Sequence, residues 1–241
     1  MQRAIVSDIH GNLDALEVVL ADIDRRRISS VACLGDFVGY GALPNECIET
    51  LRPRIELAVA GNHDLAACGR LMLNYFNIDA ATAARWTDQH LTPEHRAYLE
   101  GLPYTADWHG MLLVHSSPAQ PEDWSYVLSP LDAEEEMRAY DHALCLIGHS
   151  HYPGAFVWNR RQVRYTRQPE IRIDSKHRYL VNVASVGQPR DGDPRAGYLL
   201  IDDERKSLTH VRLEYDVDQA VRRILEAGLP RFLGERLRWG E

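Results

Sequence analysis

Two potential metal ligands stand two residues apart near the start of the chain. Asp8 and His10 follow a short apolar run and precede a Gly-Asn turn in the segment IVSDIHGN. Carboxylate and imidazole groups bind divalent transition metals, and a strand that ends at Gly11 would place both side chains in a crevice beyond its sheet. An Asp before a turn also commonly caps the following helix. The pair therefore predicts a metal site or a helix cap, and the choice depends on ligands elsewhere in the chain.

Four further apolar runs end in polar residues that can bind a metal. These residues are Asp36, Asn62 with His63, His115, and His149 with His151. In an open α/β sheet, ligands bind in the crevice beyond the carboxyl ends of the strands, so all five strand ends are expected to contribute to one site. A single histidine of this kind is more often structural, but five coincident strand ends favour a shared metal site.

The elements that would position these residues alternate between strand and helix in the first sixty residues. Strands are predicted over residues 4–7, 31–34 and 57–60, and helices over 13–26, with Asn12 as N-cap, and 45–51. This alternation is typical of a parallel sheet that is covered by helices.

The rest of the chain combines a helical segment with further strands. Residues 65–101 are expected to be helical, with a helix start at Thr92-Pro93, and form a candidate cap beside the crevice. Two strands are predicted within 104–114, a helix over 132–140 and a strand over 143–147. Six short strands follow Gly154, and they are expected to form a mostly antiparallel second sheet before an amphipathic helix that begins near Val217.

The overall composition indicates a globular protein with little affinity for polyanions. The 241 residues, 45% hydrophobic and 26% charged, suit one large core and favour a single domain over residues 1–241. The net charge of −8 argues against nonspecific binding of nucleic acid. Because no run reaches about 18 apolar residues and no signal peptide is visible, a cytoplasmic protein without a membrane segment is expected. The four cysteines lack CxxC spacing and are expected to be reduced and structural.

Five sequence blocks resemble those of the calcineurin-like metallophosphoesterases. They are DxHGN at 8–12, GDFVGYG at 35–41, GNHD at 61–64, the apolar strand that closes on His115, and GHSH at 148–151. The blocks occur in the order that the family shows. Within the superfamily, the chain length and the segments GDxVGYGxxPN and SVGQPRDGDPRAGY resemble the compact bacterial phosphodiesterases.

The resemblance implies a four-layer α/β/β/α sandwich in which two mixed sheets are flanked by helices. It also implies two metal ions whose ligand sets share one residue. One ion would be bound by Asp8, His10, Asp36 and His151, and the other by Asp36, Asn62, His115 and His149, so that Asp36 bridges them. The ions would be divalent or mixed-valence Mn, Fe, Zn, Ni or Co, about 3.5–4 Å apart.

The resemblance further implies hydrolysis of phosphodiesters or phosphomonoesters in small molecules, by direct attack of a metal-bridging hydroxide. His63 would hydrogen-bond the phosphate and help to protonate the departing oxygen. Asp64 would orient His63 or cap the next helix. A narrower alternative is symmetric hydrolysis of diadenosine tetraphosphate, and another is a catalytically silent metal-binding scaffold. The retained His63 disfavours the scaffold.

Three further side chains are candidate substrate ligands. Arg190 and Arg195 lie in a loop rich in Gly and Pro, where a guanidinium would bind phosphate oxygens, although such a segment also serves as an exposed turn. Tyr40 would stack on a base or sugar of the substrate or pack against its own loop. The basic run at 160–178 is expected to be a solvated hairpin face rather than a nucleic-acid site.

Overall fold

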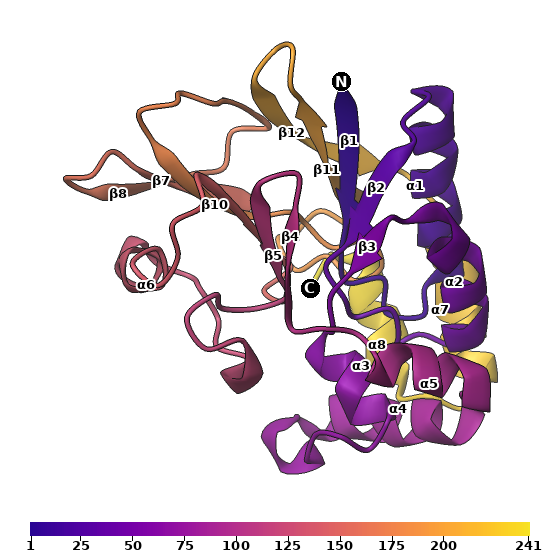
Figure 1. Cartoon of the computed structure of the whole chain (residues 1–241). Coiled ribbons are helices and arrows are strands. Elements are labelled where there is room, and N and C mark those ends of the chain that lie inside the picture. Colours follow the sequence, from indigo (N-terminus) through magenta and orange to yellow (C-terminus); the bar gives the residue numbers. More distant parts are fainter.

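Two six-stranded mixed sheets pack face to face in the computed structural model, which describes residues 1–241 apart from the Tyr75 side chain (Figure 1). In spatial order, the first sheet contains β3 (Leu57–Ala58), β2 (Ser30–Cys33), β1 (Gln2–Val6), β11 (Ala196–Asp202), β12 (Ser207–Leu213) and β9 (Glu170–Arg172). The second contains β4 (Thr105–Trp108), β5 (Met111–Val114), β6 (Leu144–Ile147), β10 (Arg178–Asn182), β7 (Gly154–Trp158) and β8 (Val163–Thr166).

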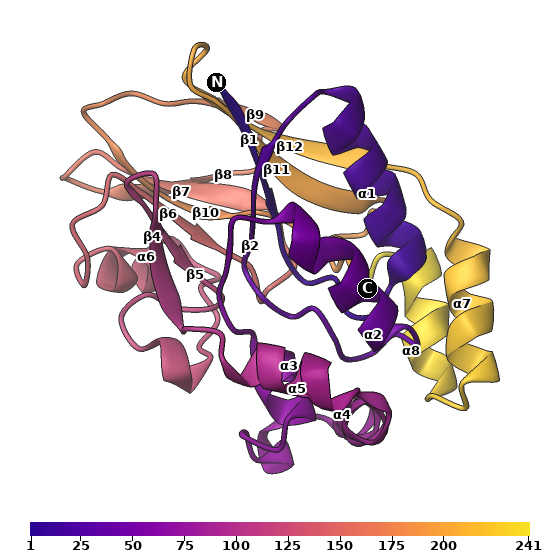
Figure 2. The ribbon, with the colours of Figure 1, turned by 45° about the vertical axis from the view of Figure 1, so that its right-hand side comes forward.

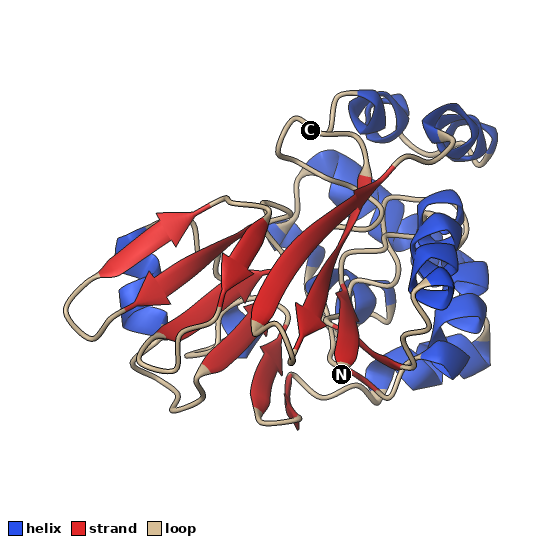
Figure 3. Cartoon of the chain, turned by 90° about the horizontal axis from the view of Figure 1, so that it is seen from above, coloured by secondary structure: helices blue, strands red, loops and turns tan.

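Helices cover the outer face of each sheet, which confirms the predicted four-layer α/β/β/α arrangement (Figure 3). The first sheet is covered by α1 (Leu13–Arg25) and α2 (Pro44–Leu51), and α7 (Val217–Glu226) packs against α1. The second sheet is covered by α6 (Pro130–Glu136). Among the described residues, no helix combines the length and the apolarity that crossing a membrane requires.

The alternation of side chains along the strands explains how two sheets share a core. In β1, Ala4 and Val6 pack toward the helices of the first sheet, whereas Ile5 packs between the two sheets. In β6, Leu146 lies between the sheets and Cys145 faces the α6 side. Successive side chains of a strand point to opposite faces, so strands that are apolar throughout are buried on both faces.

Several predicted details of the elements are confirmed. Asn12 caps α1, because its side chain accepts a hydrogen bond from the Ala15 amide at 3.2 Å. The helix-cap alternative for Asp8 is therefore wrong. Thr92 caps α5 (Pro93–Glu100) in the same way. The predicted cysteine chemistry also agrees with the structure, in which all four thiols are buried and free: Cys33, Cys47, Cys68 and Cys145.

The helical segment at 65–101 lies beyond the carboxyl ends of the first strands (Figure 2). It contains the end of α3 (Asn62–Ala67), all of α4 (Ile78–His90) and α5. A non-helical stretch separates α3 from α4, apart from one 3-10 turn at Leu73–Tyr75. The segment is thus placed beside the strand ends that carry the predicted site.

The prediction of a separate antiparallel sheet after Gly154 is wrong. Three of these strands join the second sheet (β7, β8 and β10), and three join the first (β9, β11 and β12). Strand β11 pairs antiparallel with β1, so that Leu200 lies opposite Ala4. Local alternation of apolar residues identifies a strand but does not specify a partner almost 200 residues away, which is why the sorting was missed.

Candidate metal centre and the adjoining cavity

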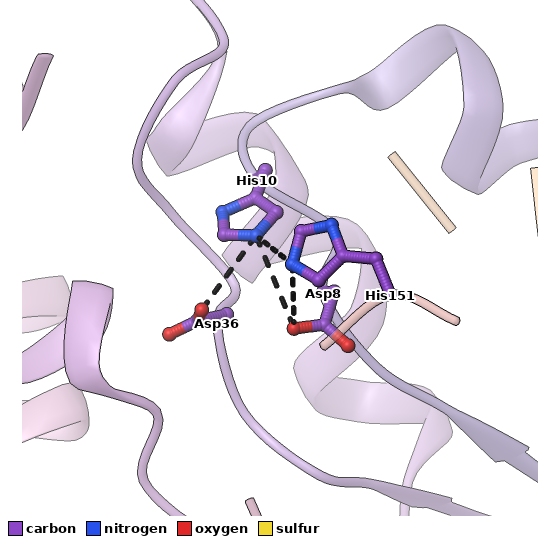
Figure 4. A group of neighbouring side chains, drawn as sticks. All are labelled: Asp8, His10, Asp36 and His151. Atoms are coloured by element: carbon purple, nitrogen blue, oxygen red, sulfur yellow. Dashed lines mark hydrogen bonds and ion pairs between the residues drawn. The ribbon is translucent and has the colours of Figure 1, made fainter. Parts of the chain in front are cut away.

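The predicted ligands meet where the carboxyl ends of strands from both sheets converge. Four side chains offer ligand atoms that all lie within 4.8 Å of one another: Asp8, His10, Asp36 and His151 (Figure 4). They follow β1, β2 and β6, so residues more than 100 positions apart share one small volume. Each of these side chains is almost completely buried.

The ligand atoms of this cluster lie close to one another. The His151 Nε2 atom is 3.2 Å from Asp8 Oδ1 and 3.2 Å from His10 Nε2. The His10 Nε2 atom is in turn 3.6 Å from Asp36 Oδ2. Two imidazole nitrogens and two carboxylates that converge in this way form a donor set typical of divalent transition metals.

Asp36 also faces a second group of predicted ligands. The His115 Nε2 atom lies 3.3 Å from Asp36 Oδ2, so this carboxylate stands between His10 and His115. The His149 ring centroid is 5.2 Å from that of His115. The His149 Nε2 atom donates to the Trp124 carbonyl at 2.8 Å, so any metal contact of His149 would use its Nδ1 atom.

Backbone carbonyls fix the orientation of three imidazoles. In each case Nδ1 donates to a carbonyl oxygen, which turns Nε2 toward the cluster, where the neutral ring would offer it to a metal. The three pairs are His10 with Val38 (3.1 Å), His115 with Leu34 (2.7 Å), and His151 with Gln188. The rings are thus oriented for metal binding by the protein itself.

The strand ends turn sharply at the predicted ligands. Five of these residues have a positive φ in the left-handed region, which L-residues adopt at a cost: Asp8 (54°), His10 (51°), Asp36 (54°), His149 (63°) and His151 (60°). Backbone hydrogen bonds hold this geometry, among them Asp8 N to Gly35 O at 3.0 Å and His10 N to Asp36 O at 2.9 Å. Such strained turns concentrate at functional sites.

The charges of the cluster suit a cation. Burial acts to raise the pKa of Asp8, but the His151 and His115 imidazoles outweigh it and hold the pKa well below its ordinary value. Burial acts to lower the pKa of His115, yet the Asp36 carboxylate raises it to about 9. Among the described residues, Asp8 Oδ2, Asn62 Oδ1 and His115 Nε2 are buried without a hydrogen-bond partner. An unpaired buried polar atom costs roughly 1–3 kcal/mol, so the residues fit a metal that would bind these atoms.

His63 lies beside the cluster without a partner for one ring nitrogen. The side chain is 4% exposed, and among the described residues its Nδ1 atom has no hydrogen-bond partner. Its ring packs against Tyr40 and His10, at centroid distances of 4.3 and 4.9 Å. Burial lowers the pKa of His63 to about 4, and Arg190 adds to this effect against the attraction of Asp36. The buried Nδ1 atom lies against Gly39, where a Cβ atom would approach it to 2.6 Å, so contact with a substrate would use Nε2.

Asp64 acts on the backbone rather than on the His63 imidazole. Its carboxylate accepts hydrogen bonds from the Gly61 amide at 3.0 Å, which caps α3, and from the Asp36 amide at 2.8 Å. The capping alternative for Asp64 is therefore what the structure shows. The approach is close, since a Cβ atom on Gly61 would lie 2.1 Å from Asp36 Oδ1. Burial and the Asp36 carboxylate raise the pKa of Asp64 to about 7.

The structure brings two of the three predicted substrate ligands to the cluster. Tyr40 packs against His10 and His63, and its hydroxyl accepts a hydrogen bond from Arg190 Nη2 at 3.2 Å. Arg195 instead pairs with Asp193 at 2.6 Å, and its side chain is 47% exposed. Substrate binding by Arg195 stays a prediction, and Arg195 does not belong to the described lining of the adjoining cavity.

The loop at 182–190 supports the cluster in a way that the sequence analysis missed. Ser185 Oγ donates to the Asp8 carbonyl at 2.9 Å and accepts from the Gln188 amide at 2.8 Å. The Gly187 amide also donates to the Asp8 carbonyl, at 2.9 Å. A Cβ atom on Gly187 would lie 1.8 Å from the Ile9 carbonyl oxygen, so only glycine permits this approach. In the sequence, this segment was noted for its family resemblance and as the source of candidate substrate-binding arginines, not as a support of the ligands.

A cavity of about 500 Å³ adjoins the cluster. Its lining includes the predicted ligands Asn62 and His149, and also His63. The remaining lining residues are Tyr40, Leu71, Phe76, Asn77, Ala80, Glu122, Asp123, Trp124 and Tyr126. Four of them belong to the helical segment 65–101, which was the candidate cap. The contribution of residues 122–126 was missed, although a long Pro-flanked loop after the predicted ligand His115 was a signal for it.

The comparisons with known proteins agree with this geometry. The calcineurin-like phosphoesterase superfamily domain matches residues 1–206. An uncharacterised protein of Methanocaldococcus jannaschii is 40% identical over 238 residues, which cover 97% of this chain and 96% of that protein. A metallophosphoesterase of Sphaerobacter thermophilus superposes with a TM-score of 0.89 at 39% identity, covering 100% of this chain and 99% of the other. A hypothetical protein of Pyrococcus horikoshii OT3 has a TM-score of 0.81 at 22% identity, with coverages of 100% and 98%. The chain therefore belongs to the calcineurin-like phosphoesterase superfamily, a family of metal-dependent hydrolases of phosphoric esters.

Proposed function

We propose that the protein is a two-metal phosphohydrolase that acts on a small phosphoester. The observation that carries this proposal is the position of Asp36, whose Oδ2 atom lies within 3.6 Å of His10 Nε2 and 3.3 Å of His115 Nε2. A buried carboxylate between two imidazoles from different sheets suits a ligand shared by two ions.

Each ion would have its own set of ligands from this chain. One set is Asp8, His10, Asp36 and His151, and the other is Asp36, Asn62, His115 and His149. Mn, Fe, Zn, Ni and Co all suit such mixed nitrogen and oxygen donors. When bound, two divalent ions would neutralise charge on the phosphoryl oxygens and lower the pKa of a water molecule.

Residues around the ligands would bind and orient the phosphoryl group. His63 would donate a hydrogen bond from Nε2 to a phosphoryl oxygen and assist protonation of the departing oxygen, because its ring lines the cavity beside the predicted ligands. Arg190 would add positive charge from behind Tyr40. Its Nη2 atom is held by Tyr40 Oη and by Gln188 Oε1 at 3.0 Å. Asp64 would keep Asp36 in place through the hydrogen bond to its amide.

The two alternatives are less well supported. A silent scaffold would not need His63 buried beside the ligands with an unpartnered nitrogen. A diadenosine tetraphosphate hydrolase would need positive charge along the bound polyphosphate, whereas the charged residues that line the described cavity are Glu122 and Asp123. We therefore favour a phosphomonoester or phosphodiester with one phosphate.

A substrate panel tests the proposal. Purified protein loaded with Mn²⁺ is incubated with p-nitrophenyl phosphate, bis-p-nitrophenyl phosphate and diadenosine tetraphosphate, and the released product is measured. We expect turnover of at least one p-nitrophenyl ester. Asp36→Asn should lower kcat/KM roughly a thousandfold, because a shared metal ligand contributes several kcal/mol to transition-state stabilisation. The exposed Asp141→Asn variant is the control. Absence of turnover on all three compounds would refute the proposal.

A further inference from the structure

The cavity beside the cluster is lined by polar groups of opposite character. Asn62, His63 and His149 connect it to the buried ligand cluster. Glu122 and Asp123 contribute two exposed carboxylates. A volume of about 500 Å³ falls within the range of pockets that hold whole small molecules, so the cavity is large enough for a substituent beside the phosphate.

Aromatic side chains form much of the cavity wall. Tyr40, Phe76, Trp124 and Tyr126 all line the cavity. Tyr126 is stacked on the His149 ring, with the centroids 4.2 Å apart and the planes 15° from parallel. This stacking places an aromatic ring directly beside a predicted metal ligand. Aromatic faces carry negative electrostatic potential and attract organic cations, with Trp the strongest of the three residue types.

The two carboxylates are not neutralised by the protein. Within the described part of the chain, neither Glu122 nor Asp123 takes part in an ion pair, in contrast to Asp191 and Asp193, which pair with arginines. No Lys or Arg is among the described residues that line the cavity. Arg190, the nearby buried cation, is engaged by Tyr40 and Gln188. The two carboxylates in the cavity lining therefore favour positive charge on a bound ligand.

We propose that this cavity selects phosphoesters in which one ester substituent carries an organic cation. This proposal rests on the proposed function. A substituted or primary ammonium on a short aliphatic chain fits the aromatic wall and the carboxylates, while the phosphate binds at the cluster. The charges would be complementary, since two divalent ions on two carboxylates would leave positive charge for the phosphate, and Glu122 and Asp123 supply negative charge for the ammonium group. The same two carboxylates would repel further phosphate groups.

Two matched esters test the charge preference. p-Nitrophenyl phosphocholine and p-nitrophenyl 3,3-dimethylbutyl phosphate release the same p-nitrophenolate and have nearly the same shape, but only the first carries a quaternary ammonium. With Mn-loaded protein, we expect kcat/KM to be about tenfold higher for the cationic ester, mainly through a lower KM, because cation–aromatic and carboxylate attraction act on binding.

Isosteric variants assign the preference to the carboxylates. In the double variant Glu122→Gln and Asp123→Asn, the ratio of the two kcat/KM values should fall from about ten to below about three, since the shape is kept and two charges are removed. Glu135→Gln changes an exposed acid on α6 that does not line the cavity, and it should leave the ratio unchanged. Equal kcat/KM values in the unchanged protein would overturn the proposal, as would a ratio that the double variant retains.

A binding measurement separates this proposal from the proposed function. Trp124 lies in the cavity wall, so its fluorescence is expected to respond when phosphocholine or 3,3-dimethylbutyl phosphate is titrated into Mn-loaded protein, and Trp124→Leu identifies the signal. If phosphocholine binds more tightly and the double variant loses this difference, the cation preference is supported even when no ester is hydrolysed. Absence of hydrolysis would refute only the proposed hydrolase activity. Equal affinities for the two compounds would refute the cation preference even if both esters are hydrolysed.

Discussion

His63 is the residue whose environment most clearly separates a catalytic role from a packing role. Its ring contacts Tyr40, His10 and Phe76 and lines the cavity beside the predicted ligands. The buried Nδ1 atom lies against Gly39, so contact with the phosphate or the departing oxygen would use Nε2. Such a contact, unlike packing alone, would make the effect of His63 on the rate depend on the leaving group.

His63→Ala should therefore affect esters in proportion to their need for a proton. An alkyl leaving group needs protonation, and we expect kcat for an alkyl phosphoester to fall by about 10²- to 10⁴-fold. p-Nitrophenolate leaves without a proton, so kcat for a p-nitrophenyl ester should fall less. Steady-state kinetics on both esters measure this difference.

His90→Ala provides the control for His63→Ala. His90 ends α4 and stacks on Trp86 at 3.8 Å, outside the cavity lining, so its removal should leave both rates unchanged. Equal losses on the two esters would limit His63 to binding the phosphate. Full activity of His63→Ala would exclude any catalytic role.

At the scale of elements, the loop at 182–190 supports the cluster of predicted metal ligands. It contacts the Asp8 carbonyl through Ser185 and Gly187, accepts the His151 Nδ1 hydrogen bond through the Gln188 carbonyl, and holds Arg190. Partners of this kind fix ligand orientation, and their loss typically weakens metal binding 10- to 100-fold.

Ser185→Ala should weaken Mn²⁺ binding about tenfold, because the Asp8 carbonyl and the Gln188 amide each lose a hydrogen-bond partner. The free energy of unfolding should fall by about 1–2 kcal/mol. Calorimetric titration and urea denaturation measure the two effects. Ser30→Ala removes another buried serine whose partner, His109, lies outside the cluster, and it should affect stability alone. An unchanged Mn²⁺ affinity in Ser185→Ala would contradict a supporting role for this loop.

The sequence allowed most elements and the converging strand ends to be predicted, because their signals are local. Apolar runs that end in Asp8, Asp36 or His149 mark strands and possible ligands within a few residues. The pairing of β11 with β1 and the approach of Ser185 to Asp8 depend instead on contacts between residues that are at least 177 positions apart. Such contacts are fixed by packing of the whole chain, which no local pattern reports.

The cavity wall was missed for a related reason. Glu122 and Trp124 lie in an irregular loop without hydrophobic periodicity, and their position depends on how this loop packs against the second sheet. The positive φ of Asp8 and Asp36 was equally invisible, because non-glycine residues adopt this region only where the surrounding structure imposes it.

For the whole molecule, the ligand set joins the two sheets. Asp8 and Asp36 follow strands of the first sheet, whereas His115 and His149 follow strands of the second. Ions bound between them would link the two sheets beyond their shared apolar core. Metal binding should consequently stabilise the entire fold, since a ligand that binds only the folded state raises its stability.

Thermal unfolding with and without metal tests this coupling, and Asp8→Asn makes the test specific. At Mn²⁺ concentrations of about 100 Kd, the expected gain of about 2.7 kcal/mol corresponds to a Tm increase of roughly 5–10 °C over chelator-treated protein. Asp8→Asn should lose this increase together with metal content and activity. Its metal-free Tm should fall by only a few degrees, because Asn keeps the shape of the side chain and the apolar strands that form the core are untouched, although the attraction of Asp8 to His151 and His115 is lost. Either of two results would show that Asp8 is a structural residue: a metal-free variant that no longer folds, or a variant with normal metal content and a lower Tm. That structural role would differ from helix capping, which Asn12 already provides.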